Sequence, residues 1–147
     1  MKALLYSLLL SCALNFASAY CDEVPLLAVT DKSLLVHGTM NDTVIGTFII
    51  DTGSVYTVIT PEMASKLGVD MVHAKTTTIM TVNGVKTVPL VTIPSIKLGF
   101  NEVKNSKAII TSLGDDPVLA GLLGMSFFDE FEFSISGKKL NLKAKGK

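Results

Sequence analysis

Short apolar runs, rich in valine, isoleucine and threonine, alternate with turn-forming residues along the chain from about residue 34 onward. Strands of half-buried sheets have this length and composition, and they end where glycine, proline, asparagine or aspartate bends the chain. The pattern therefore predicts an all-β fold, a small closed barrel or sandwich, with one or two short helices. The expected strands are residues 34–36, 44–50, 78–82, 85–88, 91–99, 103–111, 131–135 and 140–142.

One helix is indicated by the signals at its two ends. Thr60 can accept hydrogen bonds from the free N–H groups of a first turn, and Pro61 suits the first helical position. Gly68 suits the residue that follows a last turn. These signals bound residues 62–67, whose apolar side chains lie one turn apart and should face the barrel.

The clearest hairpin lies between residues 76 and 90, where Asn83-Gly84 separates two apolar runs. This dipeptide fits a two-residue type I′ turn, in which Gly84 adopts positive φ without steric cost. An earlier hairpin is expected to turn at Asn41-Asp42. Its second strand leads directly into an Asp-Thr-Gly-Ser tetrapeptide.

The first nineteen residues are expected to form a secretory signal peptide. Lys2 gives a short positive start, residues 3–16 are mostly apolar, and Ala17-Ser18-Ala19 is a small-x-small cleavage site before Tyr20. The mature protein should then be exported and periplasmic. An uncleaved membrane anchor is the alternative, although the apolar stretch is shorter than the ~20 residues that a spanning helix needs.

The rest of the chain is long enough for one domain with a single core. The expected organisation is a signal peptide at 1–19, an N-terminal extension at 20–33, one domain at 34–143 and a basic tail at 144–147. After cleavage Cys21 is the one remaining cysteine, so no internal disulfide can form. The fold must therefore be stabilised by its core.

Charge and residue types exclude some functions. The 13 basic side chains are all lysines and balance 13 acidic ones, so the formal net charge is zero. No nucleic-acid partner is expected, because such proteins carry a basic stripe, usually with arginine. His37 and His73 lack cysteine or carboxylate neighbours at metal-ligand spacing, so no metal or other cofactor is expected.

Asp51-Thr52-Gly53-Ser54 is the segment most suited to chemistry. Asp51 lies between two β-like apolar runs, where an ionised carboxylate needs hydrogen-bond partners or else holds a proton. Either state suits a catalytic acid or base. Thr52 and Ser54 supply hydroxyls, and Gly53 lets the backbone bring an N–H toward the carboxylate. Taken alone, Asp-Thr-Gly is also compatible with a simple turn after a strand.

Two apolar residues followed by Asp51-Thr52-Gly53-Ser54 resemble the catalytic loop of aspartic proteases. A second segment, Leu122-Leu123-Gly124, resembles the hydrophobic-hydrophobic-Gly sequence that passes beside that loop and precedes a short helix in those enzymes. The order and spacing are most similar to bacterial, envelope-associated retropepsin-like proteases, from about residue 34 to residue 142. The resemblance implies a retropepsin-like barrel or sandwich with a flap hairpin.

A retropepsin-like enzyme needs two catalytic aspartates, and this chain has one matching loop. The resemblance therefore implies a homodimer that hydrolyses polypeptides through a water activated by two Asp51 carboxylates, without a metal or organic cofactor. Thr52 would brace the two loops against each other. Gly53 and Ser54 would hold each carboxylate in place.

The resemblance also places the substrate groove. The Asn83-Gly84 hairpin corresponds to the flap that closes over an extended peptide, although an ordinary surface hairpin has the same sequence signature. The residues expected at the flap and in the substrate-binding groove are Met80, Val82, Asn83, Gly84, Leu122, Leu123 and Gly124.

The chain departs from the retroviral pattern in two places. Val55-Tyr56 and Met125-Ser126 stand where retroviral enzymes usually carry an acidic residue and an arginine. That ion network is therefore missing, and a dimer has to use other contacts, such as the terminal hairpin. Two other functions stay open: a non-catalytic exported peptide-binding domain, and an envelope assembly protein anchored by an uncleaved N-terminus.

The signal-peptide hypothesis makes a direct prediction. The exported protein should begin at Tyr20, because signal peptidase cuts after small residues such as those at Ala17 and Ala19. N-terminal sequencing of protein recovered outside the cytoplasm checks this. Recovery of an intact Met1 terminus from that fraction would reject cleavage and favour the anchored form.

Overall fold

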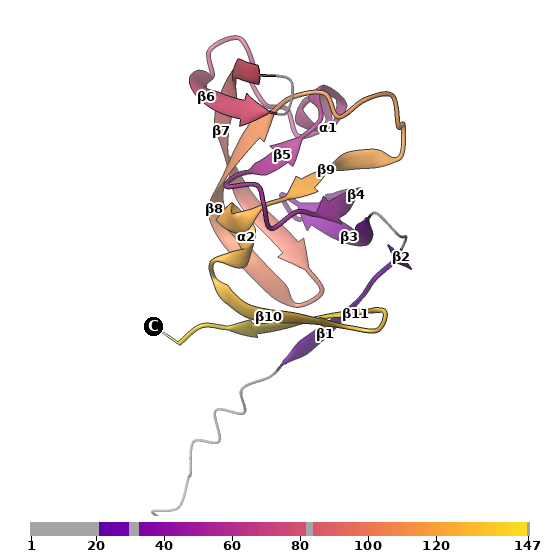
Figure 1. Ribbon diagram of the computed structural model, residues 1–147. Coiled ribbons are helices and arrows are strands. Elements are labelled where there is room, and N and C mark those ends of the chain that lie inside the picture. The colour runs from indigo at the N-terminus through magenta and orange to yellow at the C-terminus, as the bar shows by residue number, and fades with distance from the viewer. Residues whose placement is uncertain (1–20, 30–32, 82–83, 147) are drawn as a thin grey trace, which may run out of the picture.

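The computed structural model describes residues 21–29, 33–81 and 84–146, so the expected signal peptide at 1–19 lies outside it. The described chain is built mostly from strands, with two short helices (Figure 1). The elements are β1 (Asp22–Pro25), β2 (Ala28–Val29), β3 (Leu34–Met40), β4 (Val44–Ile50), β5 (Thr57–Ile59), α1 (Pro61–Lys66), β6 (Lys75–Thr81), β7 (Gly84–Leu98), β8 (Asn101–Ile110), β9 (Leu119–Leu123), α2 (Met125–Phe128), β10 (Phe131–Ser136) and β11 (Lys139–Ala144).

A closed barrel forms the centre of the molecule. Its sheet has the strand order β2-β3-β4-β9-β5-β8-β7-β6, and a further pairing between β3 and β7 closes the ring. That closing contact pairs Thr39 with Lys97 and Met40 with Ile96. The predicted all-β fold with a closed barrel is thereby confirmed. Within the described residues, no helix is long and apolar enough to cross a membrane.

Strand β9 lies between β4 and β5 and brings two distant segments together. It runs parallel to β4, with Ile50 opposite Leu123, and antiparallel to β5, with Val58 opposite Leu122. Because parallel strands end at the same edge of a sheet, the residues after Ile50 and after Leu123 emerge side by side. The two sequence segments that resemble a protease site therefore meet in space.

The main core fills the barrel and continues under the terminal strands. Fully buried side chains on its inner face include Phe48, Phe127 and Phe128, and the rings of the latter two meet edge to face at 5.2 Å. Such aromatic pairs add stabilisation beyond the area that they bury. Because Phe127 and Phe128 belong to α2, the core fixes the helix that follows Gly124.

Helix α1 begins and ends where its sequence signals predict. The Thr60 hydroxyl accepts a hydrogen bond from the Met63 N–H at 3.2 Å, and Gly68 adopts φ of 67° after the last turn. Met63 is buried in the core, and Leu67 packs against it. The predicted structural role of this helix is confirmed.

Strand β7 differs from its prediction. Two strands were expected over residues 85–99, but one strand of 15 residues runs from Gly84 to Leu98. Its first half pairs with β6 and its second half with β8. The partner changes at Leu90, which pairs with Lys75 of β6 and with Ile109 of β8.

A second, three-stranded sheet has the order β1-β11-β10 and lies at the end of the molecule opposite the β6–β7 hairpin (Figure 1). The residues before 34 were expected to form an extension outside the domain, yet β1 pairs with β11 along its whole length. Val24 and Leu26 are buried, because they extend the core beneath this sheet. A domain boundary at residue 34 therefore leaves out a strand of the fold.

The start of β1 is also tied to the barrel. Asp22 Oδ2 accepts hydrogen bonds from the Phe100 N–H and from Asn101 Nδ2, both at 2.9 Å. At the other end of the chain Lys145, expected in a solvated tail, donates its N–H to the Glu130 carbonyl at 3.0 Å. The ends of this sheet are thus attached to the rest of the molecule.

The close packing of β9 against β5 makes a stability prediction. A Cβ at Gly121 would lie 2.0 Å from the Val58 carbonyl oxygen, so Gly121→Ala must push the two strands apart. We expect the free energy of unfolding to fall by about 3 kcal/mol, as for a severely overpacked core. Urea unfolding followed by circular dichroism measures it.

Gly146→Ala is the matched control, because a Cβ there meets nothing within 4 Å. It adds the same methyl group and should leave the unfolding midpoint unchanged. Equal midpoints for the two variants would contradict the described contact between β9 and β5.

Candidate functional site

The loop from Asp51 to Tyr56, called here the Asp51 loop, connects the end of β4 to the start of β5. The Asp51 carboxylate is held by its own loop: Oδ1 accepts from the Gly53 N–H at 3.0 Å, and Oδ2 accepts from the Ser54 hydroxyl at 2.7 Å. A Cβ at Gly53 would lie 3.2 Å from Oδ1, so a side chain there would crowd the carboxylate. Both oxygens of one half-buried carboxylate are therefore oriented by short local hydrogen bonds.

Thr52 is solvent-exposed, as is the neighbouring Gly53. Among the described residues, its hydroxyl makes no hydrogen bond. Gly53 and Ser54 thus contact the carboxylate as expected for loop support. The bracing role expected for Thr52 requires a partner outside this chain.

The second segment, Leu123 to Ser126, holds the Asp51 loop through backbone hydrogen bonds. The Asp51 N–H donates to the Leu123 carbonyl at 3.0 Å, and the Met125 N–H donates to the Ser54 carbonyl at 2.8 Å. A Cβ at Gly124 would lie 2.3 Å from the Tyr56 carbonyl oxygen, so glycine is required for this approach. The structure therefore places Gly124 against the Asp51 loop.

The β6–β7 hairpin, expected to be the flap, presents two different faces. Val82 and Asn83 lie outside the described residues. Gly84 adopts the expected positive φ, 108°, but it is the first residue of β7 and pairs with Thr81, so the hairpin does not turn at Asn83-Gly84 as predicted. Met80 and Val85 lie opposite each other and are 87% and 71% exposed. On the other face, Val88 is buried and Ile79 packs beside it. One face of the hairpin is thus solvent-exposed and apolar, and the other covers a small core.

This second core is a cluster that lies between the hairpin and the strands flanking the Asp51 loop. Its buried members are Val58, Val88 and Ile109, and its half-buried members are Tyr56, Ile79, Leu90, Leu113 and Leu122. Tyr56 belongs to the Asp51 loop, and Leu122 lies on β9. The hairpin, the loop and the β9 segment therefore meet at one apolar cluster.

Leu123 and Met80, two of the residues expected to line the substrate groove, lie on strand faces opposite to those of Leu122 and Ile79. Leu123 is fully buried in the main core, because neighbouring residues of β9 point to opposite faces. Met80 faces solvent, on the side of the hairpin opposite Ile79. Of Leu122, Leu123 and Met80, Leu122 alone lies in the cluster. Its neighbours there, Ile79 and Val58, were not predicted from the sequence. Alternation along a strand predicts that neighbouring residues face opposite sides. Which of the two sides faces the core depends on tertiary contacts.

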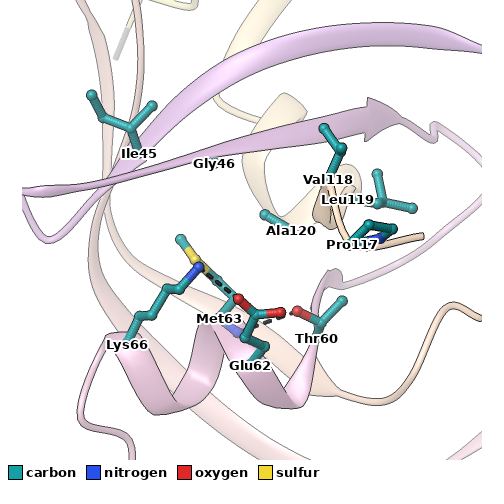
Figure 2. A pocket seen from close by; sticks show the side chains of 10 residues that line it. All are labelled: Ile45, Gly46, Thr60, Glu62, Met63, Lys66, Pro117, Val118, Leu119 and Ala120. Carbon is teal, nitrogen blue, oxygen red and sulfur yellow. Dashed lines mark hydrogen bonds and ion pairs between the residues drawn. The ribbon is translucent and has the colours of Figure 1, made fainter. Parts of the chain in front are cut away.

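Two surface hollows lie apart from the Asp51 loop. The first, of about 70 Å³, opens between α1, β4 and the segment before β9, and the Glu62–Lys66 ion pair lies at its edge (Figure 2). The second, of about 230 Å³, borders Asp115 and Asp116. Neither is lined by any residue from Asp51 to Ser54. Asp115 and Asp116 are not followed by Thr-Gly-Ser, as Asp51 is. Asp116 caps a local turn by accepting the Val118 N–H at 2.9 Å.

Hydrogen bonds shift the pKa of two exposed side chains in the described part of the chain. A hydrogen bond from the His73 side chain lowers the pKa of Asp70, and a hydrogen bond with Asp42 raises the pKa of Lys97. Across the described ranges, no three histidine, cysteine or acidic side chains are grouped as a metal site would require.

Comparisons with known proteins match this geometry. A family model described as "Aspartyl protease" matches residues 36–127, which include both the Asp51 loop and the Leu122-Leu123-Gly124 segment. Among solved structures, a retropepsin-like aspartic protease from Rickettsia conorii is similar, with 32% sequence identity and a TM-score of 0.68. The match covers 85% of this chain and 92% of that chain. A search of curated proteins gave no match.

The hairpin tip allows a prediction about peptide cleavage. Gly84 has positive φ and open space around it, so Gly84→Val strains the turn without a clash. If the hairpin is a flap, kcat/KM for a peptide should fall about tenfold or more, while the melting temperature changes little. Steady-state kinetics and thermal unfolding on the same preparation measure both.

Gly137→Val is the matched control, because Gly137 has φ of 57°, open space and a hairpin turn of its own, between β10 and β11. It should impose similar strain with normal cleavage per folded molecule. A Gly84→Val protein that loses stability yet cleaves normally would show that the β6–β7 hairpin serves only as scaffold.

Proposed function

The chain belongs to the aspartyl protease family, and we propose that it is an endopeptidase that works as a homodimer, with one Asp51 from each protomer in a shared active site. The observation that carries the proposal is the Asp51 carboxylate, held by Gly53 and Ser54 against the Leu123 to Ser126 segment. A carboxylate fixed in this way is prepared for proton transfer, because it needs no reorientation during the reaction.

One protomer supplies half of such a site. Asp51 has no second carboxylate partner among the described residues, since its oxygens are bound by Gly53 and Ser54. A two-fold axis beside the loop would bring the second Asp51 opposite the first, as an isologous contact does. The exposed Thr52 hydroxyl, which has no hydrogen-bond partner among the described residues, is then available to the facing loop.

The pair of carboxyls would activate water. Two carboxylates about 3 Å apart cannot both ionise, so they share one proton. The ionised member accepts a proton from a water molecule, whose oxygen attacks the scissile carbonyl carbon. A proton held by the pair then passes to the leaving amine, and the bond between carbon and nitrogen breaks. No metal or organic cofactor is needed for these steps.

We expect extended apolar peptides as substrates. Ile79 and Leu122 are half-buried members of the apolar cluster between the hairpin and the Asp51 loop, so both are close to where a peptide would lie. A flap closing on an extended peptide would add backbone hydrogen bonds and exclude water from the carboxylates. In this proposal Ile79 and Leu122 contact the substrate, and Leu123 supports them from the core.

The dimer has to form without the ion network of retroviral enzymes. Val55 is uncharged and 70% exposed on the loop itself. In the terminal sheet, β11 is paired on both sides, so the open edges belong to β1 and β10. We expect the protomers to associate through the Asp51 loops and these edges, with a modest dissociation constant.

We place the mature enzyme outside the cytoplasm, in the periplasm. The proposal rests on the apolar stretch and on Ala17-Ser18-Ala19. A cut before Tyr20 would leave β1 whole, since that strand begins at Asp22.

Mixing wild type with Asp51→Asn tests the shared site. The variant should fold normally and be inactive, because an amide cannot exchange the proton. With a threefold excess of Asp51→Asn under exchanging conditions, random pairing leaves only about a quarter of wild-type chains in intact dimers. Activity should fall to that level, and wild-type specific activity should also fall on dilution.

Asp115→Asn is the control, because it removes a carboxylate from a surface loop and should not suppress activity when mixed in the same excess. Activity that is independent of dilution and merely additive on mixing would overturn the shared site. Peptide binding without any cleavage would instead favour a non-catalytic binding domain.

A further inference from the structure

Ser126, in the short helix α2, connects three elements beneath the Asp51 loop. Its N–H donates to the Val55 carbonyl at 2.9 Å, and its carbonyl accepts from the Ser106 hydroxyl of β8 at 3.1 Å. Its own hydroxyl accepts from the Thr57 N–H at 2.8 Å and donates to Thr57 Oγ1 at 3.1 Å. Backbone and side chain of one residue thus bind the loop, β5 and β8.

Burial makes these contacts important. Thr57 is fully buried and Ser106 is 4% exposed, so water cannot replace the Ser126 oxygens. A buried N–H that loses its acceptor is strongly unfavourable, and the backbone shifts to avoid it. The position of Thr57 therefore depends on the Ser126 hydroxyl.

The helix does not hold Ser126 by itself. Helix α2 has four residues, and Gly124 at its N-cap offers no side chain to its free N–H groups. The N–H groups of Met125 and Ser126 instead donate to the Ser54 and Val55 carbonyls. Loop and helix therefore fix each other, and the Ser126 side chain links the helix to Thr57, the first residue of β5.

The hydrogen bond between Thr57 and Ser126 fixes the C-terminal end of the Asp51 loop. The Asp51 N–H is bound to Leu123 at the start of the loop, and the Thr57 N–H is bound to Ser126 just after it. Ser54, whose hydroxyl orients the carboxylate, is separated from Thr57 by only two residues. A displacement of Thr57 is therefore transmitted to the hydrogen bond that Ser54 makes.

We propose that Ser126 is a positioning residue for catalysis, whose hydroxyl sets the orientation of the Asp51 carboxylate by fixing Thr57. This inference rests on the proposed protease function of the same loop. Ser126 contacts neither substrate nor reacting atoms, so its removal should lower kcat while leaving KM nearly unchanged. Small displacements of a catalytic group reduce turnover steeply.

The test compares Ser126→Ala with Ser126→Thr and Ser95→Ala at enzyme concentrations that saturate the dimer. Ser95 is the matched control, because it is 6% exposed and its hydroxyl donates to Glu102 Oε1 at 2.7 Å on another strand pair. We expect kcat to fall about tenfold or more in Ser126→Ala with KM within twofold. Ser126→Thr keeps the hydroxyl and should restore most of kcat, and Ser95→Ala should lower only the melting temperature.

A readout without catalysis separates this inference from the proposed function. Amide hydrogen exchange at Gly53 and Ser54 should be about tenfold faster in Ser126→Ala than in Ser95→Ala, because the loop loses its far anchor. If wild type cleaves no peptide, the proposed function fails, and amide exchange alone decides the role of Ser126. Equal exchange in the two variants would overturn it.

Thr57→Val serves if Ser126→Ala does not fold. It removes the Oγ1 acceptor but keeps the N–H bond to Ser126, so a smaller loss of kcat is expected. Normal kcat in every folded Ser126 or Thr57 variant, with only the melting temperature lowered, would show that the network is purely structural.

Discussion

The parallel pairing of β4 with β9 is the contact on which the rest of the site depends. It aligns Ile50 with Leu123, and the hydrogen bond from the Asp51 N–H to the Leu123 carbonyl continues the ladder into the loop. Two glycines let the β9 segment also approach β5 and the Asp51 loop, because Gly121 faces the Val58 carbonyl and Gly124 the Tyr56 carbonyl at distances that no Cβ could occupy. One strand thereby positions the carboxylate, the helix beneath it and the cluster under the hairpin.

Uncharged hydrogen bonds support the loop where retroviral enzymes use an ion network. The Ser126, Thr57 and Ser106 hydroxyls form a buried network, and Val55 and Met125 contribute backbone groups to it. Neutral hydrogen bonds in a buried site are little affected by salt, whereas exposed ion pairs are screened. The internal geometry of the loop should therefore be insensitive to ionic strength, even where association of two chains is not.

The predictions that rested on local sequence signals were reliable. Helix α1 followed from Thr60, Pro61 and Gly68, and the support of Asp51 by Gly53 and Ser54 followed from neighbours in the chain. The family resemblance also placed Leu122-Leu123-Gly124 beside the Asp51 loop, but the other contacts between distant residues were missed. The Ser126–Thr57 bond joins positions 69 residues apart. Likewise, strand alternation separates Ile79 from Met80 but does not say which of them faces the core until β5 and β9 are in place.

The terminal sheet has a kinetic consequence. Strand β11 lies between β1 and β10 of its own chain, so a protomer forms this three-stranded sheet without a strand from a neighbour. Folding is then a first-order event, and assembly of the proposed active site is a separate, second-order one. In dilute solution the protein would consist of folded but inactive monomers. Its total activity would rise with the square of the protein concentration until dimers predominate. Local accumulation of the chain, without cleavage or refolding, would be enough to start proteolysis.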